Sequence, residues 1–299
     1  MSISKLFSEK SLVLSYELFP PKTEKGEAAL FQHVERLCEF SPDFITCTYG
    51  AGGSTREKTL RIIADVKKRF GVPVASHLTL VGSSADQLRS YLDTAREAGV
   101  DYIVALRGDP PQGESEFTPT DGGFRYANEL VDFIRSEFGN EFSIAVAGYP
   151  EKHVEAVSLD TDLENLKRKV DAGADIVITQ LFYDNHDYFT FCDRCSDLGI
   201  DIPIVPGILP VTNFAQVQRI TNLCGSKLPD DFAQAMMQND DPDHQYQVGV
   251  EFATRQVNEL IENGVPGIHF YVLNKSRATM EVLGQTSFHS QASASPGTG

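Results

Sequence analysis

The sequence contains no apolar run long enough to span a bilayer, and its start, MSISKLFSEK, lacks the apolar core of a signal peptide. We therefore expect a cytoplasmic protein that does not enter a membrane. Positive charge is also scarce, since 26 Lys and Arg stand against 42 Asp and Glu for a net charge of −16. Such a surface repels phosphate backbones and anionic headgroups, so no nucleic-acid or membrane partner is predicted.

Cysteine is sparse and has no disulfide-framework spacing. The chain has five, an odd number, as is typical of reduced thiols in a reducing compartment. Cys192 and Cys195 form a C-x-x-C, and no second pair accompanies them. A redox pair or half of a zinc site remains an alternative, but the pattern favours two thiols on a helix face.

Short apolar segments alternate with amphipathic stretches along the chain. The segments are near-continuous in apolar residues, which is typical of parallel strands buried on both faces. Eight strand and helix units in one chain predict a single (β/α)8 TIM barrel over residues 1–285, with an open doubly wound sheet as the alternative. The predicted strands are 12–18, 44–49, 73–80, 102–106, 142–147, 176–181, 202–205 and 267–273.

Three segments interrupt this alternation. Residues 107–125 form a long loop rich in Pro, Gly and acids, and loops on that rim of a barrel usually cover the active site. Residues 229–244 are an acidic excursion that we interpret as a solvated surface. The tail, 286–299, is small and polar, and we expect it to be disordered.

Polar residues gather where the predicted strands end, which is where barrel enzymes carry their catalytic groups. One such residue is usually a cap, but a set that converges from seven strands predicts a functional site. No Lys ends a strand, which disfavours a Schiff-base aldolase, and the acids are too few for a metal centre. The set is Glu17, Thr48, Tyr49, His77, Arg107, Asp109, Tyr149, His153, Gln180, Tyr271 and Asn274.

Two further patterns bear on ligands. The glycine-rich segment 50–53 does not match a dinucleotide fingerprint, because Thr55 stands where the last glycine should be. It predicts a tight turn or a backbone that approaches a flat ligand. A polar stripe recurs at helical spacing and is either a solvated face or a set of groups that binds a ligand's phosphates. The stripe is Asp162, Asn165, Arg168 and Lys169.

Motifs spread over the whole predicted barrel resemble those of the methylenetetrahydrofolate reductases, in family order. The resemblance implies a FAD-containing barrel that takes a hydride from NADH or NADPH in a ping-pong cycle. The hydride then reduces 5,10-methylenetetrahydrofolate to 5-methyltetrahydrofolate for methionine synthesis, in a homo-oligomer. The motifs are SYELFPPK from Ser15, TYGAGGSTRE from Thr48, SHLT from Ser76, ALRGDPP from Ala105, AGYPEKHVEA from Ala147, NLKRKVDAGADIVITQLFYD from Asn165, PGILPVTNF from Pro206 and HFYVLN from His269.

The resemblance also assigns roles by motif position. Glu17 matches the proton donor that opens the folate ring to an iminium, and Asp109 matches an acid near flavin and pterin. Substrate contacts fall on Asp109, Gln180, Phe214, Tyr271 and Lys275, where Lys275 replaces the Arg of some members. Flavin contacts fall on Thr48, Tyr49, Ala51, His77, Arg107, Gly108, Asp109, Tyr126, Ala127, Tyr149, His153, Ala156, Asp162, Asn165, Arg168 and Lys169.

Within that assignment, Arg168 and Lys169 meet the flavin diphosphate, and desolvation in an apolar strand raises the pKa of Glu17. Because the chain ends after the barrel, we expect no C-terminal regulatory domain. The alternatives are another FAD-dependent barrel oxidoreductase, such as a proline-dehydrogenase-like enzyme, and a non-catalytic flavin or folate carrier. The sequence has no Rossmann acid or arginine that would indicate NADH or NADPH.

Overall fold

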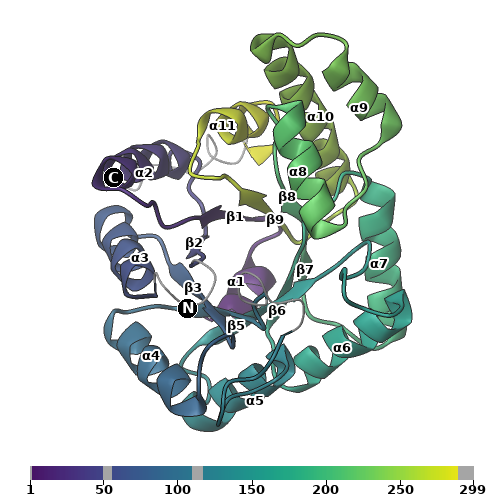
Figure 1. Cartoon of the computed structure of the whole chain (residues 1–299). Helices are drawn as coiled ribbons and strands as arrows, with labels where there is room; N and C mark the ends of the chain where they lie inside the picture. Colours follow the sequence, from purple (N-terminus) through teal and green to yellow (C-terminus); the bar gives the residue numbers. More distant parts are fainter. Residues whose placement is uncertain (1, 50–55, 110–116, 289–299) are drawn as a thin grey trace.

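Parallel strands form a ring that helices surround (Figure 1). The computed structural model describes residues 2–49, 56–109 and 117–288. The strands lie in the order β7-β6-β5-β4-β3-β2-β1-β9-β8, and the outermost two are consecutive in the chain, so the sheet curls into a nearly closed barrel. This confirms the predicted (β/α)8 fold. The strands are β1 (Val13–Leu18), β2 (Phe44–Cys47), β3 (Val74–Thr79), β4 (Tyr102–Leu106), β5 (Ser143–Gly148), β6 (Ile176–Thr179), β7 (Ile204–Val205), β8 (Gly207–Ile208) and β9 (Gly267–Tyr271).

The seventh predicted strand, 202–205, ends before Pro206, and a short strand that was not predicted, β8, follows this proline. Proline has no N–H to donate, so the hydrogen-bond ladder cannot run through it. The residues before it, β7, pair with β6, and the residues after it, β8, pair with β9. This side of the ring therefore consists of two short strands that pair with different neighbours, and only the first of them was predicted.

Helices pack their apolar faces against the outside of the sheet. Side chains at their first residues hold several of them in place, as where Ser84 and Gln87 form a capping box at the start of α4. The helices are α1 (Ile3–Glu9), α2 (Glu24–Cys38), α3 (Arg56–Phe70), α4 (Ala85–Glu97), α5 (Ala127–Phe138), α6 (Leu159–Asp171), α7 (Asn185–Asp197), α8 (Phe214–Cys224), α9 (Asp230–Met237), α10 (Pro242–Glu262) and α11 (Arg277–Gly284).

Helix α1, which the sequence patterns did not predict, closes the amino-terminal end of the barrel. It lies across the centre of the ring in Figure 1. Its Ile3 and Leu6 are buried in one cluster with interior residues such as Phe44 and Tyr102. The backbone N–H of Ile3 donates to Ser143 Oγ at 3.0 Å. Apolar side chains therefore close the amino-terminal end of the barrel.

The interpretation of residues 229–244 as solvated surface is wrong for one face. Helix α9 buries Phe232 and Met236, and the Phe232 ring stacks on Phe252 of α10 with their centroids 3.9 Å apart. Its acids lie in the first turn, where the helix dipole favours negative charge. The ordered chain also continues beyond the predicted boundary at residue 285, since Phe288 is buried in the main core.

The C-x-x-C pair lies on α7, as the simpler interpretation expected. Cys195 is buried and Cys192 is half-buried, and burial raises the pKa of Cys192 to about 11 and of Cys195 to about 12. Thiols so hard to ionise are poor nucleophiles and poor metal ligands. Across the described ranges no cluster of His, Cys, Asp and Glu has the make-up of a metal site, and no helix is long and apolar enough to cross a membrane.

Candidate functional site

A cavity of about 550 Å³, called here the main cavity, opens at the carboxyl ends of the strands. Its walls come from nearly every strand of the barrel, so residues far apart in the sequence meet there. Most of the predicted site residues line it. They are Glu17, Thr48, Tyr49, His77, Arg107, Gly108, Asp109, Tyr149, His153, Gln180 and Tyr271.

Glu17 lies at the inner end of this cavity between two imidazoles. Its Oε2 is 3.3 Å from Nε2 of His77 on β3 and 3.9 Å from Nε2 of His269 on β9. On the other side of the His269 ring, Nδ1 shares a 2.8 Å hydrogen bond with Ser15 Oγ. Ser15, Glu17 and His269 are all buried, so β1 and β9 together present one enclosed polar cluster.

The pKa of Glu17 shifts opposite to the sequence-based expectation. Burial alone raises it, but His77 and His269 interact with the carboxylate and lower it to about 2. The expectation of a raised pKa is therefore wrong for the protein without ligand, because it considered desolvation and not the neighbouring strands. Burial lowers the pKa of His269, although Glu17 opposes that effect.

One wall of the main cavity is formed where Tyr49, which follows β2, bonds to Thr79 at the end of β3. The hydroxyl of Tyr49 donates to Thr79 Oγ1 at 3.1 Å and accepts the backbone N–H of Thr79. Thr48, one residue earlier, anchors α3 because its carbonyl accepts from Thr59 Oγ1 at 3.0 Å. These bonds hold a flat, aromatic-edged surface beside His77. Ala51, which the resemblance assigns to this region, lies outside the described residues.

Arg107 stands at the mouth of the cavity in a two-point ion pair. Its Nη1 and Nη2 each lie 2.6 Å from a carboxylate oxygen of Glu155. The pairing fixes the plane of the guanidinium, because both N–H groups are engaged by one carboxylate. Next in the chain, Gly108 has φ +87°, and a Cβ there would lie 3.0 Å from the Thr79 and Val81 side chains. Glycine thus lets the backbone turn toward Asp109, which also lines the cavity.

The polar stripe on α6 divides into an inner and an outer half. Lys169 donates from Nζ to the carbonyl of Ala147 at 2.5 Å and lies 5.9 Å from the Tyr149 ring centroid. Asp162 accepts the backbone N–H of His153 at 2.9 Å. Both therefore adjoin the cavity wall, and burial lowers the pKa of Lys169 to about 8.

The outer half of the stripe is remote from the cavity. Arg168 and Asn165 are exposed and bond to each other, with Nη1 3.2 Å from Oδ1. Tyr126 and Ala127 begin α5, where the Tyr126 side chain is exposed. Ala156 and Phe214 are also absent from the cavity wall, and Phe214 packs beside the buried cluster around Phe232. Their assigned contacts stay predictions.

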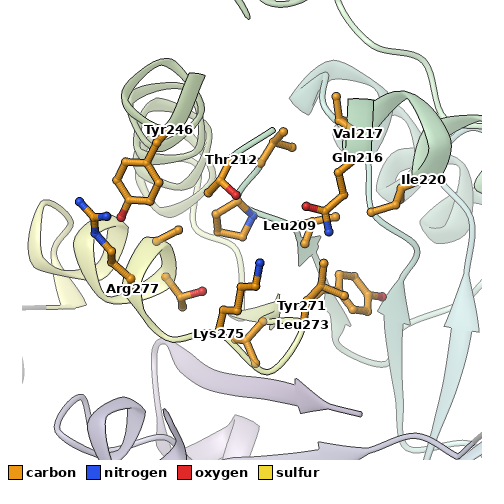
Figure 2. Close-up of a pocket in the computed structure, with 15 residues that line it drawn as sticks. Leu209, Thr212, Gln216, Val217, Ile220, Tyr246, Tyr271, Leu273, Lys275 and Arg277 are labelled. Carbon is orange, nitrogen blue, oxygen red and sulfur yellow. The ribbon is translucent and has the colours of Figure 1, made fainter. Parts of the chain in front are cut away.

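Lys275 lines a second cavity of about 240 Å³, shown in Figure 2. The two cavities share four wall residues: Leu209, Ile220, Tyr271 and Leu273. Tyr271 is fixed between them because its hydroxyl donates to the carbonyl of Thr179 at 2.7 Å.

The sequence patterns missed Ser15, His269 and Glu155 as members of the site. A signal for the first two exists: Ser15 and Glu17, like His269 and Tyr271, are polar residues at alternate positions of an apolar strand. Alternate positions of a strand face the same side, so both pairs point inward together.

Comparison with known proteins gives the chain its relatives. A family model described as methylenetetrahydrofolate reductase matches residues 2–287. The chain belongs to the methylenetetrahydrofolate reductase family. The 5,10-methylenetetrahydrofolate reductase of Escherichia coli (strain K12) is 40% identical over 270 residues, covering 90% of this chain and 88% of that protein. Methylenetetrahydrofolate reductase (NADH) 1 of Arabidopsis thaliana is 38% identical over 291 residues, covering 94% of this chain and 49% of that protein.

Length separates these relatives of the reductase family. The chain spans about half of the plant proteins, with 47% of the Zea mays relative covered, but most of the bacterial ones. Among solved structures, an uncharacterised protein from Clostridium thermocellum, which binds two copies of 5-methyl-5,6,7,8-tetrahydrofolic acid, superposes with a TM-score of 0.64. It is 14% identical and covers 97% of this chain and 98% of its own, which supports the shared fold.

Proposed function

We propose that this member of the reductase family reduces 5,10-methylenetetrahydrofolate to 5-methyltetrahydrofolate, with FAD as its cofactor and NADH or NADPH as the electron donor. The observation that carries the proposal is the meeting of Glu17, Asp109 and Gln180 in one cavity that eight of the residues assigned to the flavin also line. The names of the bacterial and plant relatives support the reaction, and the NADH in the plant names supports that donor. The folate bound by the Clostridium thermocellum protein agrees with the proposed substrate.

The chemistry of the main cavity fits a flavin with a diphosphate. Lys169 is a partly buried cation with a pKa lowered to about 8, and no carboxylate of the described residues lies within ion-pair distance of it. An anionic phosphate beside it would favour the charged ammonium. FAD, when bound, accepts a hydride from the nicotinamide and returns it to the folate. Thr48, Tyr49, His77, Arg107, Gly108, Asp109, Tyr149, His153, Asp162 and Lys169 would hold its inner part, and Ala51, Tyr126, Ala127, Ala156, Asn165 and Arg168 its outer part.

Glu17, beside the His77 and His269 imidazoles, is the proposed donor of the proton that opens the folate ring. Before a ligand binds, the carboxylate is ionised, because His77 and His269 lower its pKa to about 2. A ligand that covers the cavity excludes water, which strengthens desolvation and moves the proton toward the carboxyl oxygen. Glu17 then delivers it to the leaving ring nitrogen, and Ser15 keeps His269 oriented.

The remaining polar groups orient the substrate. Asp109 is an acceptor for pterin N–H groups. Gln180 accepts the N–H of Leu181 with Oε1 at 2.9 Å, which directs its amide nitrogen to act as the donor. Phe214, at the start of α8, is the ring proposed to stack on the alternating substrates. Lys275 is proposed to bind the folate glutamate from the second cavity.

The proposal extends to the organisation of the chain. Residues 1–285 would form one catalytic domain in a cytoplasmic homo-oligomer. Most of the tail that the sequence predicts, 286–299, lies outside the described residues. The plant relatives are about twice as long, so their additional segment has no counterpart in these residues.

A visible spectrum followed by anaerobic half-reactions tests the function. The purified protein should show oxidised flavin that NADH or NADPH bleaches, and methylenetetrahydrofolate should restore the colour. Proline is the comparison substrate for the rival barrel oxidoreductase. Bleaching by proline, or bound flavin that neither nicotinamide bleaches, would contradict the proposal.

A further inference from the structure

The loop between β5 and α6, residues 149–158, contains two successive tight turns. The carbonyl of Tyr149 accepts the backbone N–H of Lys152 at 3.1 Å, and the carbonyl of His153 accepts that of Ala156 at 3.0 Å. Two of the residues assigned to the flavin, His153 and Ala156, are thus the first and last residues of the second turn. The conformation of this turn decides where they stand relative to the main cavity, which His153 lines.

Lys152 lies between the two turns in a conformation that its residue type seldom adopts. Its φ is +90°, a region that residues with a Cβ enter only at a cost in backbone strain. Its half-buried side chain folds back over the second turn, where Nζ donates to the carbonyls of His153 at 3.1 Å and Ala156 at 2.6 Å. The ammonium therefore bridges both ends of the turn, and these two bonds offset the strain.

The second turn also fixes the hydrogen-bonding state of His153. Its Nδ1 accepts the backbone N–H of Glu155 at 3.1 Å, so the neutral ring carries its proton on Nε2. The ring meets that of Tyr149 edge to face, with the centroids 4.7 Å apart. Burial and the charge of Arg107 lower the pKa of His153, so the imidazole stays neutral near pH 7. His153 is thus a neutral donor for a ligand's oxygen or nitrogen.

Neighbouring segments hold the loop from outside. The backbone N–H of His153 donates to Asp162 Oδ2 on α6 at 2.9 Å, and Glu155 forms the two-point ion pair with Arg107. In the first turn, Glu151 Oε1 accepts the backbone N–H of Lys227 at 2.8 Å. These contacts place the loop at the mouth of the barrel, while Lys152 holds its second turn together from within.

We propose that Lys152 is a positioning residue for the flavin, because its ammonium holds the turn from His153 to Ala156 in the binding conformation before the cofactor arrives. This rests on the proposed function. Lys152 does not line the main cavity, and its Nζ is directed at carbonyls of its own loop, so it acts through His153 and Ala156. A loop that is already ordered loses less conformational entropy on binding, and the cofactor is bound more tightly as a result.

The test titrates FAD into the apoprotein and follows the flavin fluorescence, which needs no turnover. Lys152→Met keeps most of the side chain but removes the ammonium, and it should weaken FAD binding about tenfold. Amide hydrogen exchange of residues 153–156 in the apoprotein should become faster, while the free energy of unfolding changes little. Lys152→Arg, which can again donate to both carbonyls, should recover most of the affinity.

Two further variants separate the bridge from strain and from net charge. Lys152→Gly removes the strain at φ +90° but has no side chain to form the bridge, so it should bind FAD as weakly as Lys152→Met. Lys25→Met removes an exposed positive charge from α2 and should bind FAD as the wild type does.

Several outcomes would overturn the inference. These are wild-type affinity in Lys152→Met or in Lys152→Gly, an equal loss in Lys25→Met, and no recovery in Lys152→Arg. If Lys152→Met does not fold, the comparison of Lys152→Arg with Lys152→Gly decides, and equal affinities of these two contradict the bridge. Wild-type protein that binds FAD no better than its Lys152 variants contradicts this inference alone. Wild-type protein that binds no FAD contradicts the proposed function as well.

Discussion

Glu17 and His77 contact each other across the barrel interior, Oε2 to Nε2 at 3.3 Å, although β2 lies between their strands. The contact exists because alternate residues of β1 and β3 point into the same enclosed space. It keeps the Glu17 carboxylate ionised before a substrate arrives, because His77 and His269 lower the pKa of Glu17 to about 2.

Glu17→Gln should separate the two half-reactions. The amide keeps the size of the side chain but has no transferable proton. Bleaching of the flavin by the nicotinamide needs no such proton and should stay near the wild-type rate. Reoxidation by methylenetetrahydrofolate should slow by about two to four orders of magnitude. Rapid-mixing kinetics measure the rate of each half-reaction. Reoxidation of the variant at the wild-type rate, or slowing of both half-reactions together, would contradict the assignment of Glu17 as the proton donor.

Lys169 should matter more than Arg168 for flavin retention. Lys169→Ala removes the partly buried ammonium beside Tyr149 and should weaken flavin binding about tenfold to a hundredfold. Arg168→Ala removes an exposed group and should have a smaller effect, and the double variant should lose most of its flavin. Flavin content per folded chain is the measurement. Lys167→Ala, which breaks only the surface pair with Asp171, is the matched control. Equal flavin content in all variants would contradict this role and would support the interpretation of the stripe as a solvated helix face.

Asp109→Asn should raise the flavin reduction potential. The carboxylate lines the cavity, and its negative charge disfavours the anionic reduced flavin. Its loss should raise the potential by about 20–40 mV and slow hydride delivery to the folate. Redox titration beside the wild type checks this, with the exposed Asp86→Asn as the control for net charge. A potential that falls or stays constant would place the carboxylate away from the flavin.

The ionised Glu17 should make stability depend on pH in a defined window. Its pKa is about 2 in the folded protein and near the ordinary value of about 4.3 when unfolded. The folded state therefore gains stability above pH ~4.3, and this gain is lost as the pH falls toward 2. Over that interval the wild type should lose up to about 3 kcal/mol relative to Glu17→Gln. Urea unfolding of both proteins from pH 7 to pH 3 measures the difference, and a constant difference would contradict the low pKa.

Gly207→Ala should destabilise the barrel next to the site. A Cβ at this position would lie 2.2 Å from the Thr179 carbonyl oxygen and 2.7 Å from the Tyr271 ring, so backbone must shift. We expect a loss of about 1–3 kcal/mol or more in the free energy of unfolding. Gly284→Ala, whose added Cβ meets nothing within 4 Å, should change stability little. Equal stabilities of the two variants would show that β8 can move without cost.

The barrel was predictable because buried parallel strands are nearly uninterrupted apolar segments. All eight predicted segments contain a strand, and the segment that ends at Val205 contains only the two-residue strand β7. Helix α1 was missed because its seven residues are too few to show a clear helical repeat of apolar residues. Its burial also depends on contacts with Phe44 and Tyr102, which lie far along the chain.

The strand-end residues of the cavity were predictable from the sequence, but the electrostatics of the cavity were not. Strand-end position alone brought Glu17, His77 and Gln180 together, because a barrel turns all those ends to one face. The direction of the Glu17 pKa depends on imidazoles from two other strands, and no local pattern around SYELFPP contains them. Arg107 likewise was assigned to a ligand, and its partner Glu155 comes from the loop after β5.

Pro206 lies at a seam of the barrel, the place between β7 and β8 where the ring of paired strands is not closed by a backbone ladder. Elsewhere around the ring, neighbouring strands are joined by a backbone ladder, but β7 and β8 form no ladder with each other. Here β6 and β9 are connected by the chain segment that contains Pro206 and by hydrogen bonds to Thr179. A ring is most compliant where it has fewest cross-links, so slow breathing of the barrel should concentrate at this seam. Thr179 on β6 and Tyr271 on β9 lie on either side of this seam, and the hydrogen bond from the Tyr271 hydroxyl to the Thr179 carbonyl links the two strands. The mouth of the main cavity is thus least rigid on the side of Thr179 and Tyr271.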